Sequence, residues 1–221
     1  MNAKPVEMIQ KIIGIFRKHG LPGGFKWLWQ SVLQRLVRSE IVFINRKRSP
    51  PAALKKVNLA IRVGDERDFQ QSIPGFPTPI DVCQARLLKG HTPYLALVED
   101  KIAYVAWTMT ANELQISYIG QPSIAVPERS VYVYDGYVLP DFRGLKIASY
   151  MLDYIANQHA EQACFTAVQS ANTPSLHMVA KTGFQPCWQY FWLRCGPISL
   201  KWRRTFDRNI SVNGAQVLPQ H

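Results

Sequence analysis

A strand-turn-helix stretch between residues 131 and 152 constrains the fold of this chain more than any other feature. Its sequence, VYVYDGYVLPDFRGLKIASYML, begins with β-branched and aromatic residues, which pack well on the pleated surface of a sheet. A short polar turn follows Pro140, and apolar residues then recur at helical spacing from Ile147 onward. The first N–H groups of a helix have no partner within it and lie at the positive end of its dipole. This corner is therefore suited to hold a phosphate group.

The corner resembles the acyl-thioester site of the GNAT superfamily of N-acyltransferases. The family pattern is Gln/Arg-x-x-Gly-x-Gly/Ala, usually preceded by Val-x-Pro. Here Val138-Leu139-Pro140 supplies the lead-in, Arg143 the first position and Ala148 the last. The sequence departs from the pattern at Lys146, where the family usually has a glycine that lets the backbone approach a phosphate closely. The charge of this lysine is expected to compensate in part.

A second segment, residues 172–184, resembles the other GNAT signature, Asn-x-x-Ala-x-x-x-Tyr-x-x-x-Gly-Phe. The residues that match are Asn172, Ser175, Lys181, Gly183 and Phe184, whereas Val179 occupies the position of the usual tyrosine. Because both signatures occur in the family's order and separation, the chain is identified as a member, with a resemblance that spans residues 58–196. The alternative is two ordinary capped helices in an unrelated α/β domain.

The predicted order of elements fits an α/β (α+β) fold with a mixed central sheet and helices on both faces, which the GNAT resemblance also implies. Residues 51–221 are expected to form the acyltransferase domain, and residues 1–50 a basic, amphipathic helical extension. The predicted strands are 41–44, 57–63, 94–98, 102–109, a run from 131, 163–168, 184–193 and 200–206, with a hairpin turn at 99–100; the predicted helices cover 81–89 and begin at 144 and 174. In the family two adjacent strands splay apart, and the acyl thioester lies in the gap.

Acyl transfer to an amine requires a donor held near the amine, a polarised carbonyl group and a neutral amine. The resemblance implies acyl-CoA as the donor, with its pantetheine arm along residues 136–139 and its diphosphate at residues 143–149. The predicted donor-binding residues are Val138, Leu139, Arg143, Gly144, Leu145, Lys146, Ile147, Ala148, Ser149, Asn172 and Ser175. No metal site is predicted.

Asp135 is the predicted catalytic base, because an acid within an apolar run needs a reason and deprotonation of an ammonium group is one. The alternative is a turn or bulge, since Asp-Gly is a turn dipeptide. The tyrosine that often protonates the departing thiolate is absent at Val179. Either the thiolate leaves without a dedicated acid, or a nearby side chain serves; the candidates are Tyr137, Tyr150 and His177.

The net charge of +11 is concentrated near the N-terminus. Through Arg62 the chain has thirteen Lys or Arg against two acids, and beyond it thirteen against thirteen. The N-terminal segment is predicted to pack on the domain as scaffold, to lie on an anionic membrane surface, or to bind an acidic partner such as an acyl carrier protein or leader peptide. Nucleic acid is the least favoured partner, because the segment lacks aromatic residues interleaved for base stacking.

The composition favours a cytoplasmic protein, with peripheral membrane attachment as the alternative. No stretch approaches the length of a transmembrane helix, no signal-peptide pattern is present, and the four cysteines form no C-x-x-C pair. The predicted function is transfer of an acyl group from acyl-CoA to a primary amine of a peptide or natural product. The basic front end and proline linker resemble those of GNAT proteins from biosynthetic clusters that modify ribosomal peptides. The alternatives are fatty-acyl transfer from a carrier protein to a peptide amine and an inactive GNAT-fold binding module.

Overall fold

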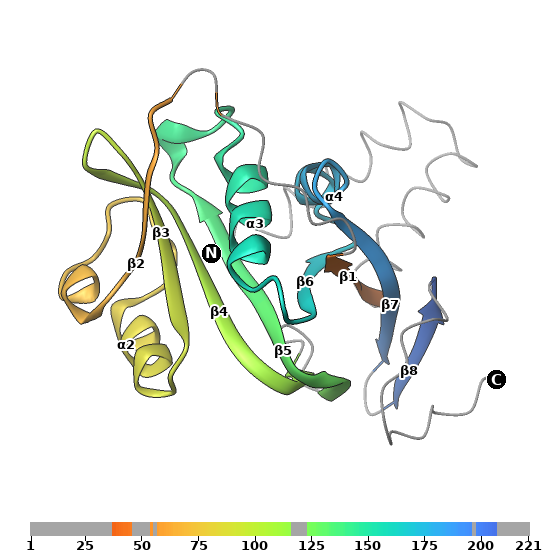
Figure 1. Cartoon of the computed structure of the whole chain (residues 1–221). Coiled ribbons are helices and arrows are strands. Elements are labelled where there is room, and N and C mark those ends of the chain that lie inside the picture. Colours follow the sequence, from red (N-terminus) through yellow and green to blue (C-terminus); the bar gives the residue numbers. More distant parts are fainter. Residues whose placement is uncertain (1–36, 46–53, 55–56, 116–122, 196–197, 207–221) are drawn as a thin grey trace, which may run out of the picture. The chain divides into compact units, whose positions relative to one another are not determined.

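The computed structural model describes residues 37–45, 54, 57–115, 123–195 and 198–206 (Figure 1). The chain divides into a larger compact unit, residues 40–190 and 203–221, and a smaller one, residues 1–39 and 191–202. Within the smaller unit, Phe191 and Trp202 stack with ring centres 5.1 Å apart. The predicted helical extension falls largely on residues 1–36, outside the described part of the chain, and stays a prediction.

The described strands form one mixed sheet (Figure 1). They are β1 (Val37–Asn45), β2 (Ala60–Val63), β3 (Thr92–Val98), β4 (Lys101–Gln115), β5 (Ser123–Val138), β6 (Cys164–Gln169), β7 (Phe184–Cys195) and β8 (Ile198–Thr205). Their order in the sheet is β2-β3-β4-β5-β6-β1-β7-β8. Strands β5 and β6 run parallel, whereas the pairs β2–β3, β3–β4, β4–β5 and β1–β6 are antiparallel.

Helical elements cover both faces of the sheet in the larger unit. They are α2 (Ile80–Leu88), α3 (Ile147–Gln158), α4 (Thr173–Val179) and the 3-10 turns η1 (Glu66–Phe69) and η2 (Pro140–Phe142). Val131 and Val133 of β5 pack with α3 and α4 on one face, and Trp107 of β4 packs with η1 and α2 on the other. This arrangement confirms the predicted fold class.

Most predicted element positions are confirmed, and strands β1, β4 and β5 are clearly longer than expected. Glu99 and Asp100 have φ angles of 49° and 60°, as a tight hairpin turn between β3 and β4 requires. Strand β4 continues to Gln115 and pairs with β5, which already begins at Ser123. The polar residues at the end of β4 carry little strand signal in the sequence, so the cross-strand pairing decides their structure.

Strand β1 has a position in the sheet that the sequence did not indicate. Residues 40–44 pair antiparallel with residues 169–165 of β6, and β1 lies between β6 and β7. Residues 40–45 therefore belong to the larger compact unit. The predicted boundary at residue 50 stays a prediction, but it falls after a strand of the sheet.

A β-bulge interrupts the pairing of β4 with β5 and sets the conformation of Asp135. Val105 pairs with Tyr137 and Trp107 with Tyr134, so β5 has one more residue than β4 between these pairs. Asp135 adopts a φ of 51°, which non-glycine residues seldom do. A Cβ atom on Gly136 would lie 2.5 Å from the Tyr104 hydroxyl, so this position requires glycine. Asp135 thus lies in a bulge, which was the alternative to a catalytic role that the Asp-Gly dipeptide indicated.

Two observations bear on the predicted cellular setting. Of the four cysteines, Cys83, Cys164 and Cys187 are buried. Among the helices described, none combines the length and apolar character needed to cross a membrane.

Candidate active site

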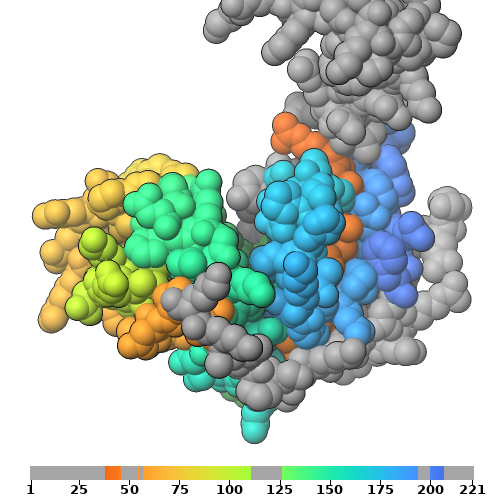
Figure 2. All heavy atoms as spheres, turned by 90° about the horizontal axis from the view of Figure 1, so that it is seen from above, coloured from red at the N-terminus to blue at the C-terminus, as the bar shows by residue number. Residues whose placement is uncertain are grey.

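A cleft of about 910 Å³ opens between β5 and β6. The two strands pair through Val131–Cys164, Tyr132–Phe165 and Val133–Thr166. Beyond these pairs, residues 134–136 of β5 and 167–169 of β6 line opposite walls of the cleft, and residues of α2, α3 and α4 complete it. Figure 2 shows the surface hollowed between the green residues that include the end of β5 and the blue residues of α4. The predicted splay of two adjacent strands therefore corresponds to a cleft in the structure.

The turn that leads into α3 has the backbone expected of a phosphate-binding corner. Gly144 has a φ of 81°, and no atom lies within 4 Å of the position that a Cβ would take there. Lys146, the N-cap residue of α3, has a φ of 62°. The left-handed conformation costs a non-glycine residue about 1 kcal/mol. Lys146 thus adopts the backbone conformation for which the family's glycine is suited, and it does so at an energetic cost. The turn therefore keeps its shape although the sequence departs from the family pattern.

The start of α3 is fixed by its apolar face. Ile147, Met151 and Ile155 are almost fully buried, so the helix cannot rotate about its axis. The first helical hydrogen bond runs from the Tyr150 amide to the Lys146 carbonyl, at 3.2 Å. The amides of residues 147–149 precede it and have no helical acceptor. Of these residues Ala148 lines the cleft. The residues present therefore fit a diphosphate held by backbone amides.

The second signature forms the wall of the cleft next to α3. The Asn172 side chain caps α4 by accepting a hydrogen bond from the Ser175 amide at 3.2 Å, and both residues line the cleft. The Gly183 amide donates to the Asp153 carboxylate at 3.0 Å, which ties the end of α4 to α3. Val179 also lines the cleft and is 1% exposed. Where the family usually has a tyrosine, this protein has an apolar surface.

The three candidates for the general acid lie outside the lining of the cleft. The Arg143 guanidinium donates to the Tyr137 hydroxyl at 3.0 Å and lies over its ring, and Tyr137 also packs edge-on against Phe76. Neither Tyr137, Tyr150 nor His177 belongs to the lining of the cleft. Leu139 lines a separate cavity of about 500 Å³ near η1 and η2. The catalytic roles of Tyr137 and His177 stay predictions.

Asp135 lines the cleft but is already paired with a cation. Its Oδ2 accepts hydrogen bonds from Arg86 at 2.6 Å and from the Thr78 hydroxyl at 3.0 Å. The Arg86 guanidinium also lies over the rings of Trp107 and Tyr134, 5.3 and 5.0 Å from their centres. The predicted role of Asp135 as base stays a prediction, and the contacts show a carboxylate that anchors α2 to β5.

Tyr134 and His91 form a hydrogen-bonded pair that the sequence did not reveal. The tyrosine hydroxyl lies 2.5 Å from His91 Nδ1, and both side chains line the cleft. Burial raises the pKa of Tyr134 to about 12. Burial also lowers the pKa of His91, and the charges of Arg86 and Lys89 lower it further. At neutral pH the pair is therefore uncharged. No local pattern signals this contact, because 43 residues separate the two side chains in the chain.

Glu40 of β1 is a second cleft-lining acid that the sequence did not single out. Its side chain is 2% exposed, and its Oε2 has no hydrogen-bond partner among the described residues. Burial raises the pKa of Glu40 to about 7. Glu40 directly precedes the apolar run from Ile41 to Ile44. An acid beside apolar strand residues is the same sequence signal that indicated Asp135.

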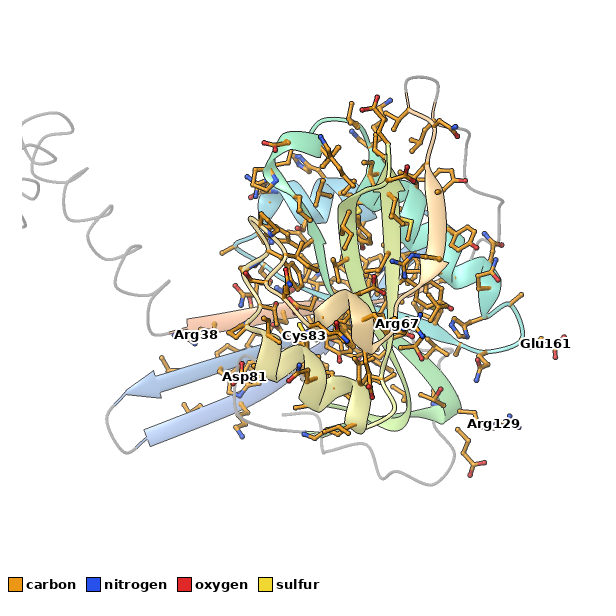
Figure 3. All side chains as sticks on the ribbon, turned by 90° about the vertical axis from the view of Figure 1, so that its left-hand side faces the viewer. Arg38, Arg67, Asp81, Cys83, Arg129 and Glu161 are labelled. Atoms are coloured by element: carbon orange, nitrogen blue, oxygen red, sulfur yellow. The ribbon has the colours of Figure 1, made fainter. Side chains whose placement is uncertain are left out.

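Helix α2 contributes the wall that faces away from α3. Figure 3 shows Asp81 and Cys83 on this helix and Arg67 on the adjacent turn η1. Asp81 is exposed at the start of α2 and lines the cleft with Arg86 and Lys89. Cys83 is 1% exposed and packs in the core with Phe69 and Trp107.

The comparison with solved structures gives several matches at low sequence identity. A functionally unknown conserved protein from Staphylococcus epidermidis has a TM-score of 0.49 at 9% identity, covering 74% of this chain and 65% of its own. A GNAT-family protein from Novosphingobium aromaticivorans has a TM-score of 0.47 at 14% identity, covering 70% and 62%. A predicted acetyltransferase from Clostridium acetobutylicum, solved with acetyl-CoA, has a TM-score of 0.39 at 20% identity, covering 58% and 90%.

The chain spans slightly less than two thirds of the length of the Staphylococcus and Novosphingobium proteins. A comparison with curated proteins gave no match. The sequence itself matches the Acetyltransferase (GNAT) family over residues 65–184, or 120 of 221 residues. These residues contain both signatures, η1, α2 and the whole β5 wall of the cleft. Because the match covers more than half of its length, the chain belongs to the GNAT acetyltransferase family.

Proposed function

We propose that this protein is an N-acyltransferase that moves an acyl group from acyl-CoA to a primary amine. The observation that carries the proposal is the α3 corner, where Gly144 and Lys146 take left-handed conformations and the first amides of α3 begin beside the cleft. Backbone amides at a helix N-terminus suit a diphosphate. In this proposal acyl-CoA is the donor substrate, and it supplies a thioester that is already reactive toward amines.

The protein's part is to position the donor, keep water out and remove protons from the amine. Residues 136–139 at the end of β5 are the edge along which a pantetheine arm would pair, because β6 no longer pairs with β5 there. Ala148, Ser175 and Val179 line the same side of the cleft with small or apolar groups. An apolar wall excludes water and raises the strength of the remaining polar contacts.

Donor binding is tested with an Ala148→Glu variant. A carboxylate in the diphosphate site repels the donor, and like-charge contacts of this kind cost several kcal/mol, so calorimetry should show CoA affinity reduced by about thirty-fold or more. The matched control is Glu161→Gln, a change in the exposed loop after α3 (Figure 3). Unchanged CoA affinity in Ala148→Glu, with a normal melting temperature, would place the diphosphate elsewhere.

Acyl transfer itself is tested by release of free thiol from acetyl-CoA, with and without a panel of primary amines. Amine-dependent release supports an enzyme, and CoA binding without release supports the inactive binding module. Release from an acyl carrier protein but not from acyl-CoA would show a carrier-protein donor, which fills the pantetheine slot and leaves the adenine side of the site empty.

The acceptor that we infer is an amine of a peptide or natural product, and the setting is the cytoplasm. The support is the charge of the N-terminal segment, thirteen Lys or Arg against two acids through Arg62, which suits an acidic leader peptide or carrier protein. Deletion of residues 1–36, which precede β1 and leave that strand and its cleft-lining Glu40 in place, should weaken binding of an acidic peptide and spare turnover of a small amine. The affected binding should also fall as salt rises.

A further inference from the structure

The acceptor side of the cleft holds two carboxyl groups, Asp135 and Glu40, and they differ in whether a protein group pairs with them. Asp135 shares its Oδ2 between Arg86 and Thr78, so its charge is balanced within the protein. Glu40 has an oxygen with no partner among the described residues. A buried carboxyl oxygen left without a partner is costly, and such groups usually mark a place where a ligand or proton is received.

The register of the sheet places Glu40 on the face opposite the donor corner. Phe43 and Val168 pack in the core cluster of α3 and α4, and alternate residues of a strand face opposite sides of a sheet. Glu40 is three residues from Phe43 and therefore faces the other side, which is the side of α2. It stands directly opposite Gln169, which also lines the cleft.

Among the described residues that line the cleft, Glu40 is the buried acid without a cationic partner. Helix α2 contributes Asp81, Arg86 and Lys89 and the loop after it His91, while β4 and β5 contribute Tyr104, Tyr132, Tyr134 and Asp135. The lining residues of β6 and α4 carry no charge, and the adjacent β7 carries the buried Cys187 and Tyr190. Arg86 is paired with Asp135, and Asp81 is exposed to solvent.

We propose that Glu40 is the carboxylate that receives the ammonium group of the acceptor and takes its first proton. This inference rests on the proposed function and names a residue for its acceptor site. One N–H bond of the ammonium breaks, its electron pair stays on nitrogen, and the proton goes to the Glu40 carboxylate. The neutral amine then bonds to the acyl carbon as the carbon–sulfur bond breaks, and the second proton of that nitrogen goes to the departing thiolate. Glu40 afterwards returns its proton to solvent.

Burial suits this role. A carboxylate shielded from water binds a cation more strongly than an exposed one does, because the surrounding dielectric is low. A carboxyl group whose pKa lies near 7, as burial gives Glu40, is also a stronger base than an ordinary glutamate and is still ionised in part at neutral pH.

The test measures binding of butylamine, with 1-butanol as its uncharged analogue, by NMR titration of the full chain saturated with CoA. The comparison is between wild type, Glu40→Gln and the exposed-loop control Glu161→Gln. We expect Glu40→Gln to lose about ten- to one-hundred-fold in affinity for butylamine, the range of a charged hydrogen bond, and to bind 1-butanol as wild type does. Glu161→Gln should match wild type for both probes. Glu40→Asp keeps the charge at a shorter reach and should fall between wild type and Glu40→Gln.

A second readout follows the ion pair that forms before the proton transfer. At pH 6 Glu40 is mostly protonated, and a bound butylammonium ion stabilises its carboxylate form, so infrared difference spectra should show the protonated carboxyl band disappear as that proton leaves to solvent. This change should be missing in Glu40→Gln. Equal butylamine affinity in wild type and Glu40→Gln, no butylamine binding by wild type, or no loss of the carboxyl band would each overturn the proposal. These measurements need no turnover. Absence of thiol release from acyl-CoA would therefore refute the proposed function separately.

Discussion

The donor and acceptor sides of the cleft are built in different ways. The donor side comes mainly from one continuous stretch, the end of β5, η2 and the start of α3, with α4 beside it. The acceptor side collects Glu40, His91 and Tyr134 from three strands or loops far apart in the chain. In the proposed function, backbone amides bind the donor, whereas individual side chains decide the chemistry on the acceptor side. The two sides should therefore respond differently to substitution.

The largest effect is expected on amine turnover. General base catalysis contributes about 10²- to 10⁴-fold, so Glu40→Gln should lower kcat/KM for a primary amine by at least a hundred-fold, with CoA affinity unchanged. The pH profile is the sharper readout. Wild-type kcat/KM should rise with pH through about 7, where Glu40 loses its proton, and the variant should lack that inflection.

Asp135→Asn provides the comparison on the opposite wall. If Asp135 is the base, this variant will depress turnover more than donor binding and remove the inflection. If Asp135 mainly anchors Arg86, the variant should lose stability and leave the inflection in place, because the guanidinium would then lie in the cleft without its carboxylate. If Glu40→Gln keeps normal turnover and Asp135→Asn is inactive, Asp135 is the base and Glu40 is not.

Glu40→Gln also tests how much the buried Glu40 carboxylate lowers the free energy of unfolding. Its pKa is raised from 4.5 to about 7, so between these pH values the folded state binds a proton that the unfolded state has lost. Stability therefore falls as pH rises through this window. Above pH 7 the cost reaches about 3 kcal/mol, since each pKa unit corresponds to about 1.4 kcal/mol. Glu40→Gln should be more stable than wild type by up to that amount at pH 8 and equal to it at pH 4, by chemical denaturation. A constant difference at both pH values would show that Glu40 does not titrate in the folded state.

The difference between the two sides also explains what the sequence could predict. The donor corner was predicted residue by residue, because its strand, turn and helix are contiguous and each has local signals, such as the apolar spacing from Ile147. The element order and the mixed sheet followed from the same kind of pattern. The start of the helix near residue 174 was also visible, because side-chain capping acts within three residues, and the structure shows that Asn172 is the residue that caps it.

The acceptor side depends on contacts that no local pattern encodes. Glu40 reaches the cleft because β1 lies between β6 and β7, a strand order that composition and periodicity do not specify. The contact of His91 with Tyr134 depends on the pairing of β3, β4 and β5 together. Asp135 was found as an acid in an apolar run, but its partner Arg86 was not, because 49 residues separate them. Contacts that depend on the order of strands in the sheet can therefore be identified only from the structure.

The smallest effect is expected at Lys146, where the donor side departs from the family pattern. Glycine takes a positive φ without strain, so Lys146→Gly should stabilise the protein by up to about 1 kcal/mol in thermal or chemical unfolding. Lys146→Ala is the matched control, because it removes the ammonium group but keeps the Cβ, and it should give no such gain. If the lysine's charge assists the diphosphate, both variants should bind CoA a few-fold more weakly at low salt and approach wild type at high salt. Equal stability of the two variants would mean that the turn is not strained, and the lysine would then be an ordinary exposed residue at the edge of the donor site.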